Sequence, residues 1–184
     1  VLRNTVLKIT NYGRRLIYHP FDTHLAHFYE QCIEAHVGYF GSIIVSLVSQ
    51  ESYNFLDAQA EKKADLEYLI QLFEDYCTSN DKAEFCYKTN ISLKGIENAY
   101  KIFKHLNHSR DGSIETALRV FSRCFEHNLC TRLSDGSYQH YRLNEKIYIH
   151  PTSGFFKRKD KKVVVVDVFC TTKTYARIVG KYYD

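Results

Sequence analysis

Hydrophobic positions in the first 110 residues recur at the three- and four-residue intervals typical of helices that bury one face. Four such runs lie within 25–33, 43–48, 66–73 and 96–106. Gly38 and Gly41 are expected to separate the first two helices, and the polar segments 57–63 and 78–81 to flank the third. The pattern predicts an N-terminal helical bundle.

After the segment 108–113 the pattern changes from helical to strand-like. One further helix is predicted over 114–130, with Ser113 as its cap. Five short strands are then predicted within 131–133, 138–143, 146–150, 162–170 and 176–183. The pair Asp135-Gly136 is a hairpin signal between the first two strands. The chain is therefore predicted to be α+β, with a small five-stranded OB-like β-barrel after the bundle.

An OB-like barrel commonly binds oligonucleotides between the loops that follow its first and fourth strands, here 134–137 and 171–175. The second loop offers Thr172, Lys173 and Tyr175. Hydroxyl and ammonium groups donate to phosphate oxygens, and a ring can stack on a base. Two alternatives stay open: Tyr175 as a residue of the barrel core, and Arg177 as a structural salt bridge.

Charge is distributed unevenly along a chain whose composition, with 45% hydrophobic and 25% charged residues, indicates a folded protein. Residues 132–184 contain eleven Lys and Arg against five Asp and Glu, whereas residues 1–131 contain fourteen against sixteen. The densest run is Lys157-Arg158-Lys159-Asp160-Lys161-Lys162. This favours a polyanion as the partner of the C-terminal part, and a solvated lysine-rich surface is the alternative.

The six cysteines form no C-x-x-C pair, so we expect reduced thiols buried as small hydrophobic residues. A zinc site made of His105, His108, Cys124 and Cys130 is the alternative. Its two cysteines stand farther apart than usual ligand pairs, so no metal is expected. No apolar run reaches the ~18 to 20 residues of a membrane span.

Catalytic motifs are absent from the sequence. Neither G-x-x-x-x-G-K-[ST] nor Asp-Glu-x-His occurs, so nothing is expected to hold ATP and magnesium. The carboxylates Asp22, Glu51 and Asp65 have no clustered His, Ser or Cys at an interpretable spacing. His150-Pro151 is interpreted as a structural turn. No catalytic residue and no cofactor are predicted for this chain.

Seven segments, in this order and spacing, resemble the auxiliary C-terminal region of DEAH-box RNA helicases. They are Leu7-Lys8-Ile9-Thr10-Asn11-Tyr12-Gly13-Arg14-Arg15-Leu16, His19-Pro20-Phe21-Asp22-Thr23-His24-Leu25-Ala26, Val48-Ser49-Gln50-Glu51-Ser52, Phe85-Cys86, Ile91-Ser92-Leu93-Lys94-Gly95-Ile96, Tyr148-Ile149-His150-Pro151-Thr152-Ser153 and Thr171-Thr172-Lys173-Thr174-Tyr175-Ala176-Arg177. Thr23, Leu66, Phe85 and Ser92 depart from the family's usual residues, so family contacts at those positions are not carried over. The resemblance implies a divergent member.

The resemblance implies three parts: the tail of a winged-helix domain at 1–19, a ratchet-like helical domain at 20–112 and an OB-fold domain at 113–184. It implies an accessory fragment of a nuclear helicase of pre-mRNA splicing or ribosome biogenesis. ATP and magnesium are expected only in the RecA-like motor domains, outside this chain. The chain has no methionine, which agrees with a fragment.

The expected partners are single-stranded RNA, the RecA-like motor domains of the same protein and protein regulators of the helicase, with no membrane. The residues expected to contact RNA are Lys157, Arg158, Lys159, Lys161, Lys162, Thr172, Lys173, Tyr175 and Arg177. The alternative function is a protein-docking platform that recruits helicase cofactors without contacting RNA. Fifteen tyrosines and twelve phenylalanines favour that alternative, because exposed aromatic rings suit protein interfaces.

Overall fold

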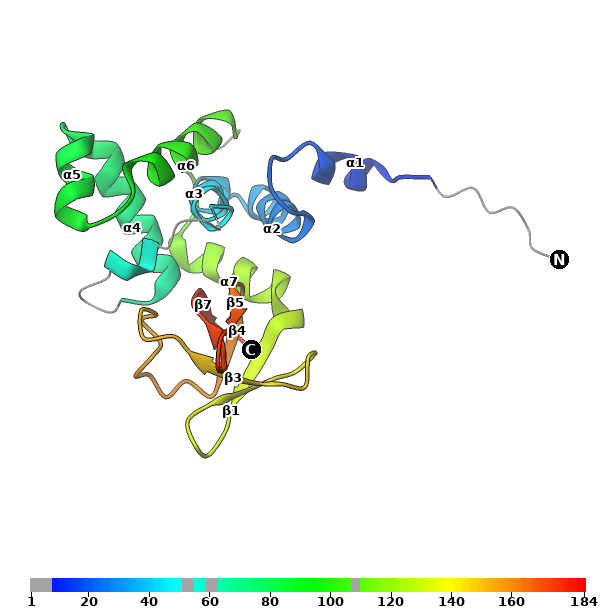
Figure 1. Ribbon diagram of the computed structural model, residues 1–184. Helices are drawn as coiled ribbons and strands as arrows, with labels where there is room; N and C mark the ends of the chain where they lie inside the picture. Colours follow the sequence, from blue (N-terminus) through cyan, green and yellow to red (C-terminus); the bar gives the residue numbers. More distant parts are fainter. Residues whose placement is uncertain (1–7, 51–54, 59–62, 107–109) are drawn as a thin grey trace.

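The computed structural model describes residues 8–50, 55–58, 63–106 and 110–184, and the chain is α+β, with helices preceding a curled sheet (Figure 1). The helices are α1 (Asn11–Ile17), α2 (Thr23–Glu34), α3 (Gly38–Val48), α4 (Asp65–Thr78), α5 (Lys82–Thr89), α6 (Leu93–His105) and α7 (Ile114–Cys124). Single 3-10 turns, η1 (Phe55–Ala58) and η2 (Glu126–Asn128), follow α3 and α7. The predicted helical N-terminal part is confirmed.

Short polar side chains cap several of these helices. Asp22 accepts hydrogen bonds from the backbone of α2, and Ser113 accepts one from the backbone of α7 at 3.2 Å. Helices α1 and α5 were not predicted from the sequence, although the signals of α5 are ordinary ones. Asp81 accepts from the Glu84 amide at 2.8 Å, and Asn90 ends the helix in the left-handed conformation with φ 53°.

We expected Gly38 and Gly41 to separate the first two helices. Instead, both belong to α3. The reason is packing rather than chain reversal. A Cβ at Gly41 would lie 2.6 Å from Cβ of Cys32, so glycine is what allows α2 and α3 to approach this closely. Glycine here marks a close contact between helices.

Seven short strands form one sheet: β1 (Leu129–Arg132), β2 (Tyr138–His140), β3 (Lys146–Ile149), β4 (Lys162–Val165), β5 (Val168–Cys170), β6 (Thr174–Ala176) and β7 (Val179–Lys181). Their order is β5-β6-β3-β2-β1-β4-β7. Strands β3 and β6 are parallel, and the other neighbours are antiparallel. The described residues therefore form seven strands where five were predicted, and the predicted five-stranded barrel is not confirmed.

The two extra strands arise because the predicted strands 162–170 and 176–183 are each interrupted. At the break, the Val166 amide donates to the Ile178 carbonyl and the Arg177 amide to the Asp167 carbonyl, both at 3.0 Å. Arg177 Nε also lies 2.6 Å from Asp167 Oδ2. Aspartate is disfavoured in strands, and this pair holds the chain out of the regular ladder at both breaks.

Two other predicted elements end early. The helix predicted to 130 ends at Cys124, because Cys130 pairs with both His140 and Val163 in the sheet. The strand predicted to 143 ends at His140. There the imidazole Nδ1 accepts from the amides of Arg142 and Leu143, both at 3.2 Å, and folds the chain into a turn.

This turn makes the stability of the protein sensitive to pH. His140 is 2% exposed, and burial lowers its pKa below the ordinary value near 6.5, more than the nearby Glu145 raises it; His127 and Arg142 lower it further. The His140 imidazole therefore binds a proton less readily in the native state than in the unfolded chain. The stabilisation that neutral His140 gives to the native state is complete above pH ~6.5 and is lost as the pH falls through the lowered pKa.

We expect the urea-unfolding free energy to fall less steeply between pH 7 and pH 5 in His140→Asn than in the original chain. Asparagine retains an acceptor but cannot be protonated there. The matched control is His105→Asn, at an exposed position of the last turn of α6. A pH dependence that is the same in His140→Asn and in the original chain would contradict this explanation.

Helix α7 joins the helices to the sheet. Its Phe121 is fully buried and packs against Phe28 of α2 and against Phe125, with ring centroids 5.4 and 4.6 Å away. A Cβ at Gly180 of β7 would lie 2.8 Å from the Phe121 ring, so glycine lets the strand lie directly on that ring. Val164 of β4 also belongs to the helical core.

A buried carboxylate makes a second connection, at the start of α4. Asp65 is 0% exposed, and its oxygens accept from Ser153 Oγ at 2.7 Å, the Gly154 amide at 2.7 Å and the Val179 amide at 2.9 Å. We call these four residues the Asp65 clamp. It fixes α4 to the loop after β3 and to the start of β7.

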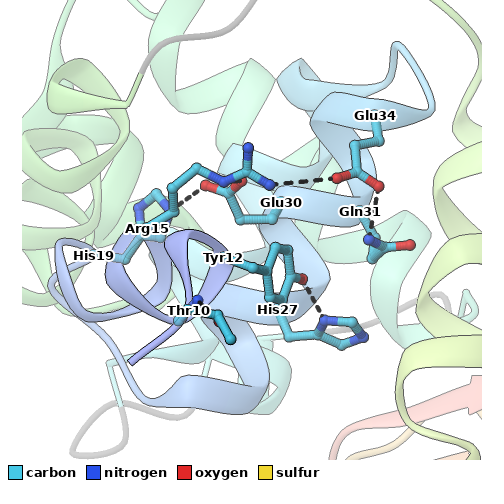
Figure 2. A network of polar contacts seen from close by, with 9 residues as sticks. Thr10, Tyr12, Arg15, His19, His27, Glu30, Gln31 and Glu34 are labelled. Carbon is cyan, nitrogen blue, oxygen red and sulfur yellow. Dashed lines mark hydrogen bonds and ion pairs between the residues drawn. The ribbon is translucent and has the colours of Figure 1, made fainter. Parts of the chain in front are cut away.

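Helix α1 is held on α2 by a polar network (Figure 2). The Tyr12 hydroxyl lies 2.6 Å from His27 Nδ1. Both oxygens of the mostly buried Glu30 are bound, one by Arg15 Nε at 3.0 Å and the other by His19 Nε2 at 2.8 Å. The contact between α1 and α2 is therefore largely polar.

The prediction of buried thiols holds for Cys32, Cys86 and Cys130, whereas Cys77 and Cys170 are exposed and Cys124 is half-buried. Burial raises the pKa of the Cys130 thiol to about 12, so this group stays protonated. In the parts of the chain that the structure describes, no group of three potential metal ligands occurs, and His108 lies outside them. No helix in those parts is both long and apolar enough to span a bilayer.

Candidate nucleic-acid interface

Four rings lie together on the sheet where β5, β6 and β3 meet. The register of the parallel pair β3 and β6 places Tyr148 opposite Tyr175, with ring centroids 6.1 Å apart. Phe169 of β5 stacks on Tyr175 at 5.9 Å, and His150 lies 5.4 Å from Phe169. All four side chains are half-buried and so remain partly accessible to solvent. We call this set the aromatic face.

Cations border the aromatic face. Lys173 Nζ lies 4.5 Å from the centre of the Tyr148 ring, and Arg177 Cζ lies 4.6 Å from that of Phe169. Lys146 Nζ lies farther from the centre of the Tyr148 ring, at 6.0 Å, and forms an ion pair with Asp135. Lys173 is exposed and has no ion-pair partner among the described residues. It is therefore the cation of the face most available to a ligand.

A groove of about 350 Å³ adjoins the aromatic face and shares Tyr148 and Tyr175 with it. We call it the basic groove, because its other walls include Arg132, Lys157, Arg158 and Lys159. The basic loop is fixed to the first hairpin by main-chain contacts. The Tyr138 hydroxyl donates to the Asp160 carbonyl and the Arg132 amide to the Lys161 carbonyl, both at 2.9 Å.

The structure brings together five of the nine residues expected to contact RNA. Lys157, Arg158, Lys159 and Tyr175 line the basic groove, and Lys173 borders it through Tyr148. Tyr175 lies in β6 rather than in the predicted loop 171–175, which is shortened to 171–173 because Thr174 pairs with Cys170. The Tyr175 ring is half-buried, so it is neither a fully buried core residue nor a fully exposed stacking surface.

The other four residues lie apart from the groove lining. Lys161 and Thr172 are exposed. Lys162 forms an ion pair with Asp184 at 2.9 Å, and Arg177 forms one with Asp167, the structural salt bridge considered as an alternative. An arginine whose charge is already matched by a neighbouring carboxylate is a weaker phosphate ligand than an unpaired one.

Sequence reasoning missed Arg132, Tyr148 and Phe169. The first is the end residue of an ordinary strand, and nothing local distinguishes it. Tyr148 and Phe169 join Tyr175 only through the parallel pairing of β3 with β6 and the antiparallel pairing of β5 with β6. Those pairings are tertiary, and the chain between the strands carries no signal for them.

A second cleft, of about 460 Å³, lies between α2 and the sheet and has mixed charge. Its rim carries Asp22, Asp167 and Arg177. The rings of His24 and His127 stack there with centroids 4.7 Å apart, and burial lowers the pKa of His127. Carboxylates at the rim repel phosphates, so this cleft does not suit a polyanion. The basic groove is the better candidate.

No protein-family model matches this sequence.

Proposed function

We propose that this chain binds single-stranded RNA through the aromatic face and the basic groove. The observation that carries the proposal is the position of Tyr148 and Tyr175, half-exposed and paired, beside Lys173 and the cations of the groove. Aromatic side chains stack on any base, and nearby cations neutralise the phosphates on either side of it. Single strands present unstacked bases for such contacts, and duplexes do not.

We also propose that the sheet is an OB-like barrel in which two strands are interrupted. If β4 with β5 and β6 with β7 are each counted as one strand, the first strand pairs with the fourth and the third pairs in parallel with the fifth. In that arrangement the segments 133–137 and 171–173 are the loops that commonly border the oligonucleotide in this fold. Gly136 and Lys173 lie in these segments, beside the groove and the aromatic face respectively.

The wider proposal is that the chain is the accessory C-terminal region of a nuclear DEAH-box helicase of splicing or ribosome biogenesis. Its support is the ordered set of sequence segments described above. In this proposal the RecA-like motor domains, outside this chain, hold ATP and magnesium and pack against it. The aromatic face and the basic groove then hold the single strand while the motor moves it.

Tyr175→Ala and Tyr148→Ala are each expected to weaken binding of a ten-nucleotide single-stranded RNA about tenfold, because each removes a stacking surface worth ~1 to 3 kcal/mol. Lys173→Ala is expected to weaken binding and to reduce the salt slope by ~0.7. Fluorescence anisotropy at two salt concentrations measures both quantities, with a duplex of equal length as the control ligand.

The matched control variant is Tyr87→Ala on α5, where the side chain is 87% exposed and remote from the sheet (Figure 1). It should bind RNA like the original chain. Equal affinity of Tyr175→Ala, Tyr148→Ala and Tyr87→Ala would remove the aromatic face from the proposal.

Docking of a protein is the second candidate, favoured by the surface of α1. Ile17 and Tyr18 are 65% and 85% exposed, and Ile9, just before the helix, is 50% exposed. The network of Figure 2 holds α1 in place through polar contacts and leaves these side chains available. Absence of RNA binding even at low salt would favour this candidate, with the motor domains and regulators of the helicase as the partners to test.

A further inference from the structure

We infer that Arg132 is the phosphate-binding residue of the basic groove, and that the groove holds one nucleotide unit with its phosphate on Arg132 and its base against Tyr175. The inference rests on the proposed RNA-binding function. It adds a ligand group and an orientation that neither the basic run of the sequence nor the aromatic face specifies.

One hydrogen-bond donor of the Arg132 side chain is unsatisfied. Arg132 Nε is shielded from solvent and has no hydrogen-bond partner among the described residues. A buried donor without an acceptor costs ~1 to 3 kcal/mol, so a protein seldom retains one without a use. A phosphate in the groove would bind the terminal nitrogens of the guanidinium, and it would reach the closed Nε atom only after the side chain shifts.

The guanidinium of Arg132 lies between the end of β1 and the turn that follows it. Arg132 ends β1 opposite Tyr138, and its Nη2 atom lies against the turn that follows. A Cβ at Gly136 would make only an ordinary contact with Nη2, at 3.4 Å, and glycine is favoured there by its φ of 88°. The turn therefore lies directly beside the guanidinium, whose planar fork matches two oxygens of a phosphate.

The charged side chains that line the groove are positive. Arg132, Lys157, Arg158 and Lys159 line the groove, and none of its described lining residues is Asp or Glu. Two acidic residues adjoin the lining in sequence: Asp160 follows Lys159 and raises the pKa of the Tyr138 hydroxyl, whereas Asp135 precedes Gly136 and accepts from Lys146 and from Ser137. The pKa of Asp135 is lowered by the hydrogen bond from Lys146 and by those from Ser137. The lining cations outnumber the carboxylates beside the groove, and an anion from outside is the matching ligand.

The size and the lining of the groove suit one nucleotide unit. About 350 Å³ accommodates one nucleotide unit rather than a helix of nucleic acid, and the lining contains Tyr148 and Tyr175 besides the cations. A base on a tyrosine and a phosphate on an arginine are the two halves of one nucleotide. A free phosphate or a protein carboxylate would use the cations and leave the rings without a partner.

The test compares Arg132→Gln, Arg132→Lys and the control Arg14→Gln, an exposed arginine of α1 at the far end of the molecule (Figure 1). Each binds a ten-nucleotide single-stranded RNA at two salt concentrations. We expect Arg132→Gln to lose about tenfold or more in affinity, with a salt slope smaller by ~0.7. Arg132→Lys should keep the slope but lose affinity, because an ammonium lacks the fork. Arg14→Gln should change neither.

A second ligand separates phosphate contact from indirect effects. A ten-nucleotide strand with uncharged methylphosphonate linkages should bind the original chain and Arg132→Gln equally, because its linkages carry no charge for the guanidinium to match. Thermal unfolding should show Arg132→Gln to be at least as stable as the original chain, since the donor it removes is unsatisfied.

The outcomes are distinct. Failure of the original chain to bind single-stranded RNA overturns the proposed function and this inference with it. RNA binding by the original chain, with Arg132→Gln equal to it in affinity and slope, overturns the inference alone and leaves the aromatic face in place. A loss in Arg132→Gln that is equally large for the methylphosphonate strand also overturns it, since the arginine would then act through the fold.

Discussion

Asp65→Ala is expected to lower the free energy of unfolding by at least ~3 kcal/mol, one of the two largest losses anticipated for a single substitution in this chain. The substitution leaves three donors of the Asp65 clamp without an acceptor: Ser153 Oγ and the amides of Gly154 and Val179. Each buried donor left unsatisfied costs ~1 to 3 kcal/mol. All three lie where water does not reach, since Asp65 itself is 0% exposed.

Urea unfolding followed by circular dichroism measures this loss, and the melting temperature should fall by roughly 6 to 12 °C. Asp75→Ala is the matched control on the same helix, because Asp75 is exposed and its carboxylate accepts from the exposed Gln71 side chain at 2.8 Å. Ser153→Ala removes one of the three donors and should cost less than Asp65→Ala. If Asp65→Ala and Asp75→Ala unfold at the same urea concentration, the clamp contributes nothing to stability.

Phe121→Ala is the other substitution with a large expected effect, a loss of ~3 to 5 kcal/mol. The ring is fully buried between Phe28 of α2, Phe125 and Gly180 of β7, so its removal leaves a cavity that three elements line. Such a cavity closes poorly, because α2 and β7 are each held by other contacts. Differential scanning calorimetry measures the change in melting temperature and enthalpy.

The control for this second prediction is Phe156→Ala, the same truncation at a ring that is 47% exposed. It should cost less than ~1 kcal/mol. A loss in Phe121→Ala no larger than that of Phe156→Ala would show that the helices and the sheet do not depend on Phe121 for their contact.

Local signals predicted the helices well. The apolar repeats and the Ser113 cap placed most of them, and α1 and α5, which were not predicted, have their own cap signals in Thr10, Asp81 and Asn90. Where helices were mispredicted, the cause was tertiary. Gly41 resembles a helix breaker in the sequence, but it lies inside α3 because Cys32 needs the space.

The sheet and the candidate site were harder to predict because they depend on pairing between distant strands. The salt bridge of Asp167 with Arg177 interrupts two predicted strands, and neither residue signals the other in the sequence. The basic run was visible as charge, and Lys157, Arg158 and Lys159 of that run line the groove. Arg132 was not predicted, since its environment depends on the conformation of Gly136 and on the main chain at Lys161.

The Asp65 clamp has a consequence for synthesis of the chain on the ribosome. The donors to Asp65 come 88, 89 and 114 residues later, so the carboxylate emerges long before any of its partners. At ~5 to 20 residues per second, the last partner is added roughly 6 to 23 s after Asp65 itself. During that interval the nascent helices present an ionised, hydrated residue at a position that later becomes completely dry. The start of α4 therefore reaches its final environment only when translation has passed β7.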